Sequence, residues 1–97
     1  MHLIIVTYDI DSTTTAGQKR QRKIAKLCES YGTRVQHSVF ECFIDAAQSR
    51  QFRTTLLSLI DEDRDQIKIY RLGKNYTSKM DTLGKTTKLD FNEPFII

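Results

Sequence analysis

The strongest constraint on the fold is an apolar run near the N-terminus, where residues 3–6 (LIIV) lead without a break into Thr7, Tyr8 and Asp9. An apolar stretch of strand length without alternating polar residues is typical of a strand that is buried on both faces. Asp9 lies where this strand ends, and a carboxylate at that place is a candidate ligand for a cation. The sequence therefore predicts a central strand with a candidate functional residue at its end.

Basic side chains cluster in the segment that follows. Between Gly17 and His37, six positive charges stand against the single acid Glu29. A lone carboxylate such as Asp9 beside so much positive charge indicates a metal-assisted site that acts on phosphates. The net charge of +3 is too small to identify a nucleic-acid binder by itself, so an ordinary solvent-exposed basic face is the alternative. The six residues are Lys19, Arg20, Arg22, Lys23, Lys26 and Arg34.

Size and composition restrict the class of protein. The 97 residues predict one domain, and a chain this small leaves roughly a third or more of its unfolded surface unburied, so it gains from a partner. No apolar run approaches the roughly 20 residues of a membrane span, and the N-terminus lacks a signal-like segment; we therefore expect a cytoplasmic protein without a membrane partner. Cys28 and Cys42 lack a CxxC spacing and are interpreted as core residues rather than metal ligands or a disulfide.

Helical periodicity covers residues 17–31, after a polar link at residues 12–15 that can cap the helix. Gly32 then predicts a left-handed cap at its end. Arg20 is the exceptional basic residue, because it falls on the apolar side of this helix. Its guanidinium can point toward the strand end that carries Asp9, or its stem can cover the edge of the core. The other basic residues of the helix share a stripe that faces solvent: Lys19, Arg22, Lys23 and Lys26.

The rest of the chain completes a recognisable order of elements. Residues 33–44 (TRVQHSVFECFI) predict either one bent strand or two strands joined near His37. Asp45 caps a second helix, and residues 66–72 (QIKIYRL) alternate as a half-buried strand. Strand, helix, strand, strand, helix, strand is the ferredoxin-like α+β arrangement, an antiparallel sheet with two helices on one face. Because the first strand is apolar on both faces, we expect the open face to pack on an identical subunit.

The predicted domain covers residues 1–84, and residues 85–97 form a C-terminal tail that we expect to dock on the partner subunit or on a third protein. A short extra strand is predicted at residues 78–83. The acidic loop at residues 61–65 resembles the opening of a calcium loop, but Gln66 and Leu72 stand where Gly and Glu are required, so we interpret it as a solvated loop. His2 and His37 lack partners at ligand spacing, which gives no indication of a zinc site.

Four segments together carry a resemblance to a known family: the strand ending in Tyr8 and Asp9, the helix that opens with Arg20 and Arg22, the phrase RVQHSVFE at residues 34–41, and the strand QIKIYRL. From residue 2 to about residue 84 the chain resembles CRISPR-associated protein 2. The resemblance implies a symmetric ferredoxin-like homodimer and a magnesium-dependent endonuclease. It also implies work with the CRISPR-associated protein 1 integrase in acquiring spacers.

The resemblance also implies roles for particular residues. The aspartate that ends the first strand is the catalytic and metal-binding residue, which matches Asp9. We expect two copies of Asp9 to face each other across the dimer axis and to hold Mg²⁺ or Mn²⁺ between them. The basic positions would hold phosphates of DNA or RNA: Arg20, Arg22 and Arg34, with Lys19, Lys23 and Lys26. The supporting positions match Tyr8, Ser38 and Phe40.

Two other functions fit the same residues. In the first, the basic surface grips duplex DNA for a partner enzyme and Asp9 is catalytically idle, which makes the protein a scaffold of the integration complex. In the second, the chain is a toxin-like ribonuclease of the virulence-associated protein D type, which shares the fold and needs no integrase. The sequence does not distinguish RNA from DNA as the substrate.

Overall fold

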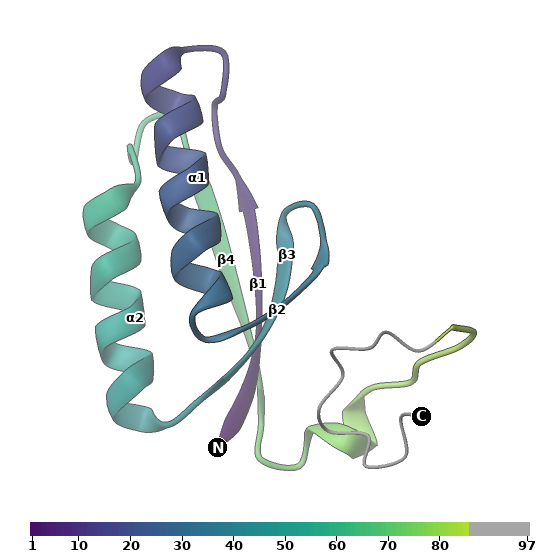
Figure 1. Ribbon diagram of the computed structural model, residues 1–97. Coiled ribbons are helices and arrows are strands. Elements are labelled where there is room, and N and C mark those ends of the chain that lie inside the picture. Colours follow the sequence, from purple (N-terminus) through teal and green to yellow (C-terminus); the bar gives the residue numbers. More distant parts are fainter. Residues whose placement is uncertain (86–97) are drawn as a thin grey trace.

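The computed structural model describes residues 1–85 (Figure 1). Its elements follow the predicted order, which confirms the ferredoxin-like α+β fold class. The strands are β1 (His2–Asp9), β2 (Gly32–Gln36), β3 (Val39–Ile44) and β4 (Gln66–Gly73). The helices are α1 (Thr15–Glu29), α2 (Ala46–Leu59) and the short 3-10 helix η1 (Tyr76–Lys79).

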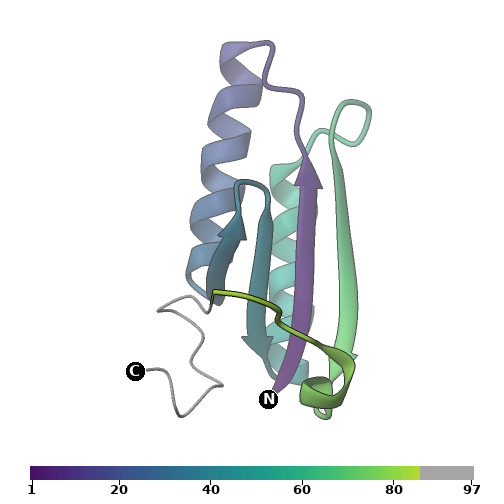
Figure 2. The same cartoon turned by 90° about the vertical axis from the view of Figure 1, so that its right-hand side faces the viewer.

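The four strands form one antiparallel sheet in the order β2-β3-β1-β4, with α1 and α2 on the same face (Figures 1 and 2). The apolar β1 therefore lies inside the sheet, as its sequence predicts. Because β4 runs antiparallel to β1, the start of β4 lies beside the end of β1, and Asp9 is the register partner of Gln66. This pairing brings the loop before β4 to the candidate functional residue.

The core fills the space between the sheet and the two helices. Alternate residues of β1, namely Ile4, Val6 and Tyr8, belong to it. Cys28 and Cys42 are also part of this core, and both are free thiols, as expected from their spacing. Burial raises the pKa of each thiol to about 12. Neither helix is long and apolar enough to cross a membrane, within the residues described.

Local signals place the element ends well, with one exception. The Thr14 side chain accepts a hydrogen bond from the Gly17 N–H at 3.0 Å and begins α1, and Asp45 begins α2 in a reciprocal capping box with Gln48. Residues 33–44 form two strands joined by a tight turn at positions 37 and 38. The prediction that Gly32 is a left-handed cap is wrong: its φ is not positive, and it begins β2.

Gly32 is instead required by close packing, because a Cβ at this position would collide with the Glu41 carbonyl of β3.

The predicted strand at residues 78–83 is also wrong. Gly73, with a φ of +77°, ends β4, and η1 follows with the Tyr76 ring packed edge-on against Phe43 at 5.6 Å. Residues 80–85 then run across the face opposite the helices (Figures 1 and 2). Apart from Lys85, the predicted tail lies outside the described residues.

Candidate functional site

Asp9 is an exposed carboxylate at the end of β1. Because strand side chains alternate, it lies on the sheet face opposite the helices, whereas Tyr8 points into the core. Within residues 1–85 its carboxylate takes part in no hydrogen bond or ion pair. Neighbouring acids differ: Asp11 and Asp61 both contact Arg64, at 3.2 and 3.8 Å. Asp9 therefore keeps both of its oxygens available to a ligand.

Asp9 is the candidate metal ligand of this site. In the described part of the chain, no three His, Cys, Asp or Glu side chains gather closely enough to hold a metal ion. Mg²⁺ is usually held by one or two carboxylates, together with waters and substrate phosphates. The oxygens of Asp9, which have no partner among the described residues, fit such a site.

Arg20 lies near the end of β1, as predicted, but its partner is Asp65 rather than Asp9. Its Nε donates to Asp65 Oδ2 at 2.8 Å and its Nη2 donates to Oδ1 at 3.3 Å. The two side chains are 19% and 0% exposed. Of the two alternatives for Arg20, the structure favours the first: its guanidinium lies near the strand end that carries Asp9, where it binds Asp65.

Asp65 also accepts the backbone N–H groups of Asp11, at 3.1 Å, and Asp61, at 2.9 Å. Burial raises the pKa of its carboxyl group, but the hydrogen bonds from Arg20 and from the two amides outweigh burial and hold the pKa below its usual value. The interpretation of the acidic segment as a solvated loop is therefore wrong for this residue. The antiparallel pairing of the first and last strands, which the predicted topology already contained, is the signal that could have identified it.

Replacing Asp65 with Asn is expected to destabilise the protein by about 2–3 kcal/mol at neutral pH, because charged hydrogen bonds are lost in a buried place. The folded pKa lies below the unfolded one, so the contribution of the carboxylate is complete above about pH 5 and is lost as the pH falls through the folded pKa. Urea unfolding at about pH 7 and about pH 3 measures both effects. The exposed Asp63→Asn variant is the control, and equal stability of Asp65→Asn and wild type at pH 7 would contradict the assignment.

The structure brings together Arg34 and the three supporting positions, Tyr8, Ser38 and Phe40. The Tyr8 N–H donates to the Ser38 carbonyl at 3.1 Å, and the rings of Tyr8 and Phe40 stack with centroids 6.2 Å apart. The Arg34 guanidinium lies 5.1 Å from the Phe40 ring centroid, in a cation–π contact. Tyr8 and Phe40 are buried, and Tyr8 also lines a hollow beside α1. The Arg34 side chain is 41% exposed, and its Nη2 lies 3.7 Å from Glu29 Oε1 in an ion pair at the surface.

Arg34 lines an open hollow of about 310 Å³ between α1 and the β2–β3 turn. Arg22 and His37 contribute to the same wall, and His37 Nε2 lies 3.3 Å from the Gln21 side-chain nitrogen. The Tyr8 hydroxyl donates to the His37 carbonyl at 3.2 Å. Gln21 and His37 are residues that sequence analysis did not select, because their proximity depends on how the turn folds back onto the helix.

The basic stripe of α1 is defined here as Lys19, Arg22, Lys23 and Lys26. All four side chains are exposed, and none of them forms an ion pair with an acid among residues 1–85. The apolar side of α1 packs on the sheet, so the basic stripe faces away from it. Asp9 lies on the other sheet face. The structure therefore does not bring the stripe and Asp9 of one chain together.

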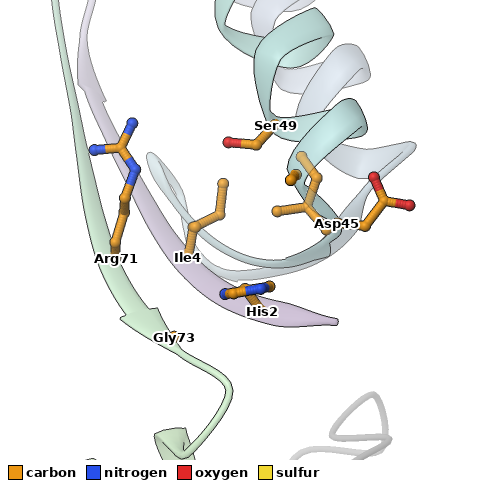
Figure 3. Close-up of a pocket in the computed structure, with 8 residues that line it drawn as sticks. His2, Ile4, Asp45, Ser49, Arg71 and Gly73 are labelled. Atoms are coloured by element: carbon orange, nitrogen blue, oxygen red, sulfur yellow. The ribbon is translucent and has the colours of Figure 1, made fainter.

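A second, smaller hollow of about 160 Å³ lies at the opposite end of β1, near His2 (Figure 3). Ile4 forms its floor, and Ser49 and Arg71 lie on its two sides. The Asp45 carboxylate caps α2 and points away from the hollow. None of the predicted site residues lines it.

Comparison with known proteins identifies the family. Residues 1–80 match the family model for CRISPR associated protein Cas2. The chain belongs to the Cas2 family. This confirms the resemblance that the sequence motifs indicate.

Individual Cas2 proteins match over nearly the whole chain. The CRISPR-associated endonuclease Cas2 of Halalkalibacterium halodurans is 46% identical over 94 residues, which cover 97% of this chain and 98% of the relative. The crystal structure of Streptococcus pyogenes Cas2 matches with a TM-score of 0.73 and 48% identity, over 84% of this chain and 99% of that one. A chain of a partial Cas6-RT-Cas1–Cas2 complex matches with a TM-score of 0.65 and 26% identity, over 86% and 85%.

Proposed function

We propose that this protein acts in CRISPR adaptation as a symmetric dimer with a metal-dependent nuclease site, and that it works with a Cas1-type integrase in acquiring spacers. The relative from Halalkalibacterium halodurans is named an endonuclease, and one structural neighbour comes from a complex that contains Cas1 and Cas2. These relatives support the proposal. The nuclease chemistry itself is argued from the residues of this chain.

The free carboxylate of Asp9 is the observation that carries the proposal. The carboxylates around it are engaged: Asp65 by Arg20, and Asp11 and Asp61 by Arg64. Asp9 is exposed, ends the central strand and has no such partner among the described residues. A carboxylate that is anchored by a buried strand and left without a cation is well placed to bind a metal ion.

Two copies of Asp9 would complete the site. In a twofold dimer joined through the sheet faces opposite the helices, part of which residues 80–85 cross, the same carboxylate would come from each chain. Two carboxylates close together repel each other, so a divalent cation between them is favoured over an empty site. When bound, the cation supplies Lewis acidity that activates water and offsets charge on the phosphate.

Other predicted residues would act on the substrate from a different part of the surface, because Arg22 belongs to the basic stripe and lies on the opposite side of the sheet from Asp9 of the same chain. Arg34 and Arg22, exposed on the wall of the large hollow, would bind phosphate oxygens through the planar fork of the guanidinium group. Tyr8 and Phe40 hold Arg34 and the β2–β3 turn in place. The hydrolysis of a phosphodiester follows from these roles, with either RNA or DNA as the substrate.

Cleavage by the purified protein tests the proposal. We expect labelled RNA or DNA to be cut in the presence of Mg²⁺ or Mn²⁺ and to stay intact when EDTA is added. Parallel reactions with single-stranded RNA, single-stranded DNA and duplex DNA distinguish the substrates. The absence of cleavage on all of them would remove the nuclease part of the proposal and leave the scaffold function.

The dimer has its own test. The open face carries Tyr70, which is 50% exposed and pairs with Ile5 across β1 and β4. Light scattering at micromolar concentration is expected to give about twice the chain mass of 11.3 kDa. Tyr70→Asp should shift the protein toward the monomer, whereas Leu57→Asp, at an equally exposed apolar position on α2, should not. A stable wild-type monomer would contradict both the dimer and the shared metal site.

The scaffold function is supported by a different observation. The basic stripe and Asp9 lie on opposite sides of the sheet, so the surface with most exposed positive charge is separate from the carboxylate of the same chain. A protein that grips duplex DNA for an integrase needs the stripe and does not need Asp9. Tight DNA binding together with the absence of metal-dependent cleavage would favour this function.

A further inference from the structure

The carboxylate of Asp65 connects three separate segments of the chain. It accepts hydrogen bonds from the Arg20 guanidinium of α1, from the Asp11 amide after β1 and from the Asp61 amide after α2. We call this group of interactions the Asp65 clasp. Within residues 1–85 every buried side-chain polar atom has a hydrogen-bond partner. The buried Asp65 carboxylate obtains its hydrogen bonds from donors in the other segments of the clasp.

The clasp fixes the backbone next to Asp9 in two places. Asp11, whose amide it binds, lies two residues beyond Asp9 in the chain. Gln66, the register partner of Asp9, directly follows Asp65. The segment after β1 also packs tightly on the first turn of α1, where a Cβ at Gly17 would collide with the Asp11 carbonyl. The direction in which Asp9 leaves β1 is therefore set by the clasp and by this close packing.

We propose that Arg20 and Asp65 are positioning residues for Asp9, and that Arg20 does not bind phosphate. This inference rests on the proposed nuclease function and assigns to Arg20 a different role from that of Arg22 and Arg34. Two of its nitrogen atoms are engaged by Asp65, and its side chain is only 19% exposed. The edge of the guanidinium formed by Nε and Nη2 is therefore occupied by Asp65, and the N–H groups that remain belong to a largely buried side chain.

The role predicts a specific kinetic pattern. Loss of the clasp leaves the phosphate-binding arginines intact and displaces the reacting carboxylate, so kcat should fall and KM should change little. A displacement of about 1 Å in a catalytic group costs up to about 100-fold in rate. We expect kcat of Arg20→Gln to fall by about 10- to 100-fold, and Arg20→Lys, which retains one charged donor, to recover part of the loss.

A double-mutant cycle with Arg20→Gln and Asp65→Asn tests the connection, under conditions in which circular dichroism shows every variant to be folded. The activity of the double variant should be no lower than that of the less active single variant, because both changes remove the same interaction. Arg22 is an exposed arginine two positions along the helix, so Arg22→Gln is the matched control. It should make the fall of log affinity with log salt less steep by about one unit. Arg20→Gln should leave this slope unchanged. Additive losses in kcat, or a less steep salt dependence of affinity for Arg20→Gln, would overturn the proposal.

Amide hydrogen exchange gives a readout that does not depend on cleavage. The Asp11 and Asp61 amides should exchange at least about tenfold faster in both variants, while the amides of the core strand β1, such as that of Val6, stay protected. Unchanged exchange at Asp11 would overturn the clasp even if activity falls. If the wild-type protein does not cleave at all, the nuclease function fails, and the exchange rates and the salt slope of Arg20→Gln still decide whether Arg20 is a positioning residue.

Discussion

Asp9→Asn is expected to lower divalent-dependent cleavage by at least about 100-fold, because changes in the surroundings of metal ligands already cost 10- to 100-fold and a lost ligand costs more. Asn has the same shape without the negative charge that holds the cation. Asp9 is exposed and free of partners among the described residues, so the substitution should change folding stability by no more than about 0.5 kcal/mol. Nucleic-acid affinity should be nearly unchanged, because the proposed phosphate-binding groups are arginines and not Asp9.

The measurement compares cleavage rates, melting curves and fluorescence anisotropy of wild type and variant. Asp63→Asn, which neutralises another exposed carboxylate, is the matched control and should cleave at the wild-type rate. Full cleavage by purified Asp9→Asn would indicate a contaminating nuclease or a different site. Loss of the folded state would instead make Asp9 a structural residue.

Neutralising the basic stripe should have the second large effect. If Lys19, Arg22, Lys23 and Lys26 contact phosphates, replacing all four with Gln should flatten the dependence of log affinity on log salt by roughly one unit per lost contact. Sequence preference should barely change, because phosphate contacts position nucleic acid without reading its bases. Binding measured at several salt concentrations gives the slope directly.

The matched control removes charge from the other helix. Arg50→Gln with Arg53→Gln neutralises two exposed arginines of α2 and should leave the salt slope close to that of wild type. An unchanged slope for the fourfold variant would show that the basic stripe serves solubility alone. The nucleic-acid surface would then have to be sought around Arg34 and the hollow beside it.

The sequence predicts most of the fold because its local patterns agree with one another. The apolar run of β1, the capping box at Asp45 and the alternation in residues 66–72 each determine one element with little help from the rest of the chain. The turn at His37 and Ser38 could not be placed, since no Gly, Pro or Asn marks it. The role of Gly32 is not visible in the sequence, because glycine is needed there to avoid a collision between a Cβ and the Glu41 carbonyl of the neighbouring strand.

The candidate site was predicted less completely than the fold. The end of the first strand placed Asp9, and the motif around Arg34 selected residues that do lie together. The partner of Arg20 is 45 positions away in the chain, and no local pattern distinguishes Asp65 from the solvated acids beside it. The only signal for Asp65 is the antiparallel pairing of the first and last strands, which places the start of β4 beside the end of β1.

The buried state of Cys28 and Cys42 also has a practical use. Reagents that label thiols react with the thiolate, and two thiols enclosed in the core with pKa values near 12 present almost none to solvent. A cysteine introduced at an exposed position, such as Glu62→Cys, would therefore be modified selectively in an otherwise native chain. If the proposed dimer forms, spin labels attached there would report the distance between its two chains directly, without removal of either natural cysteine.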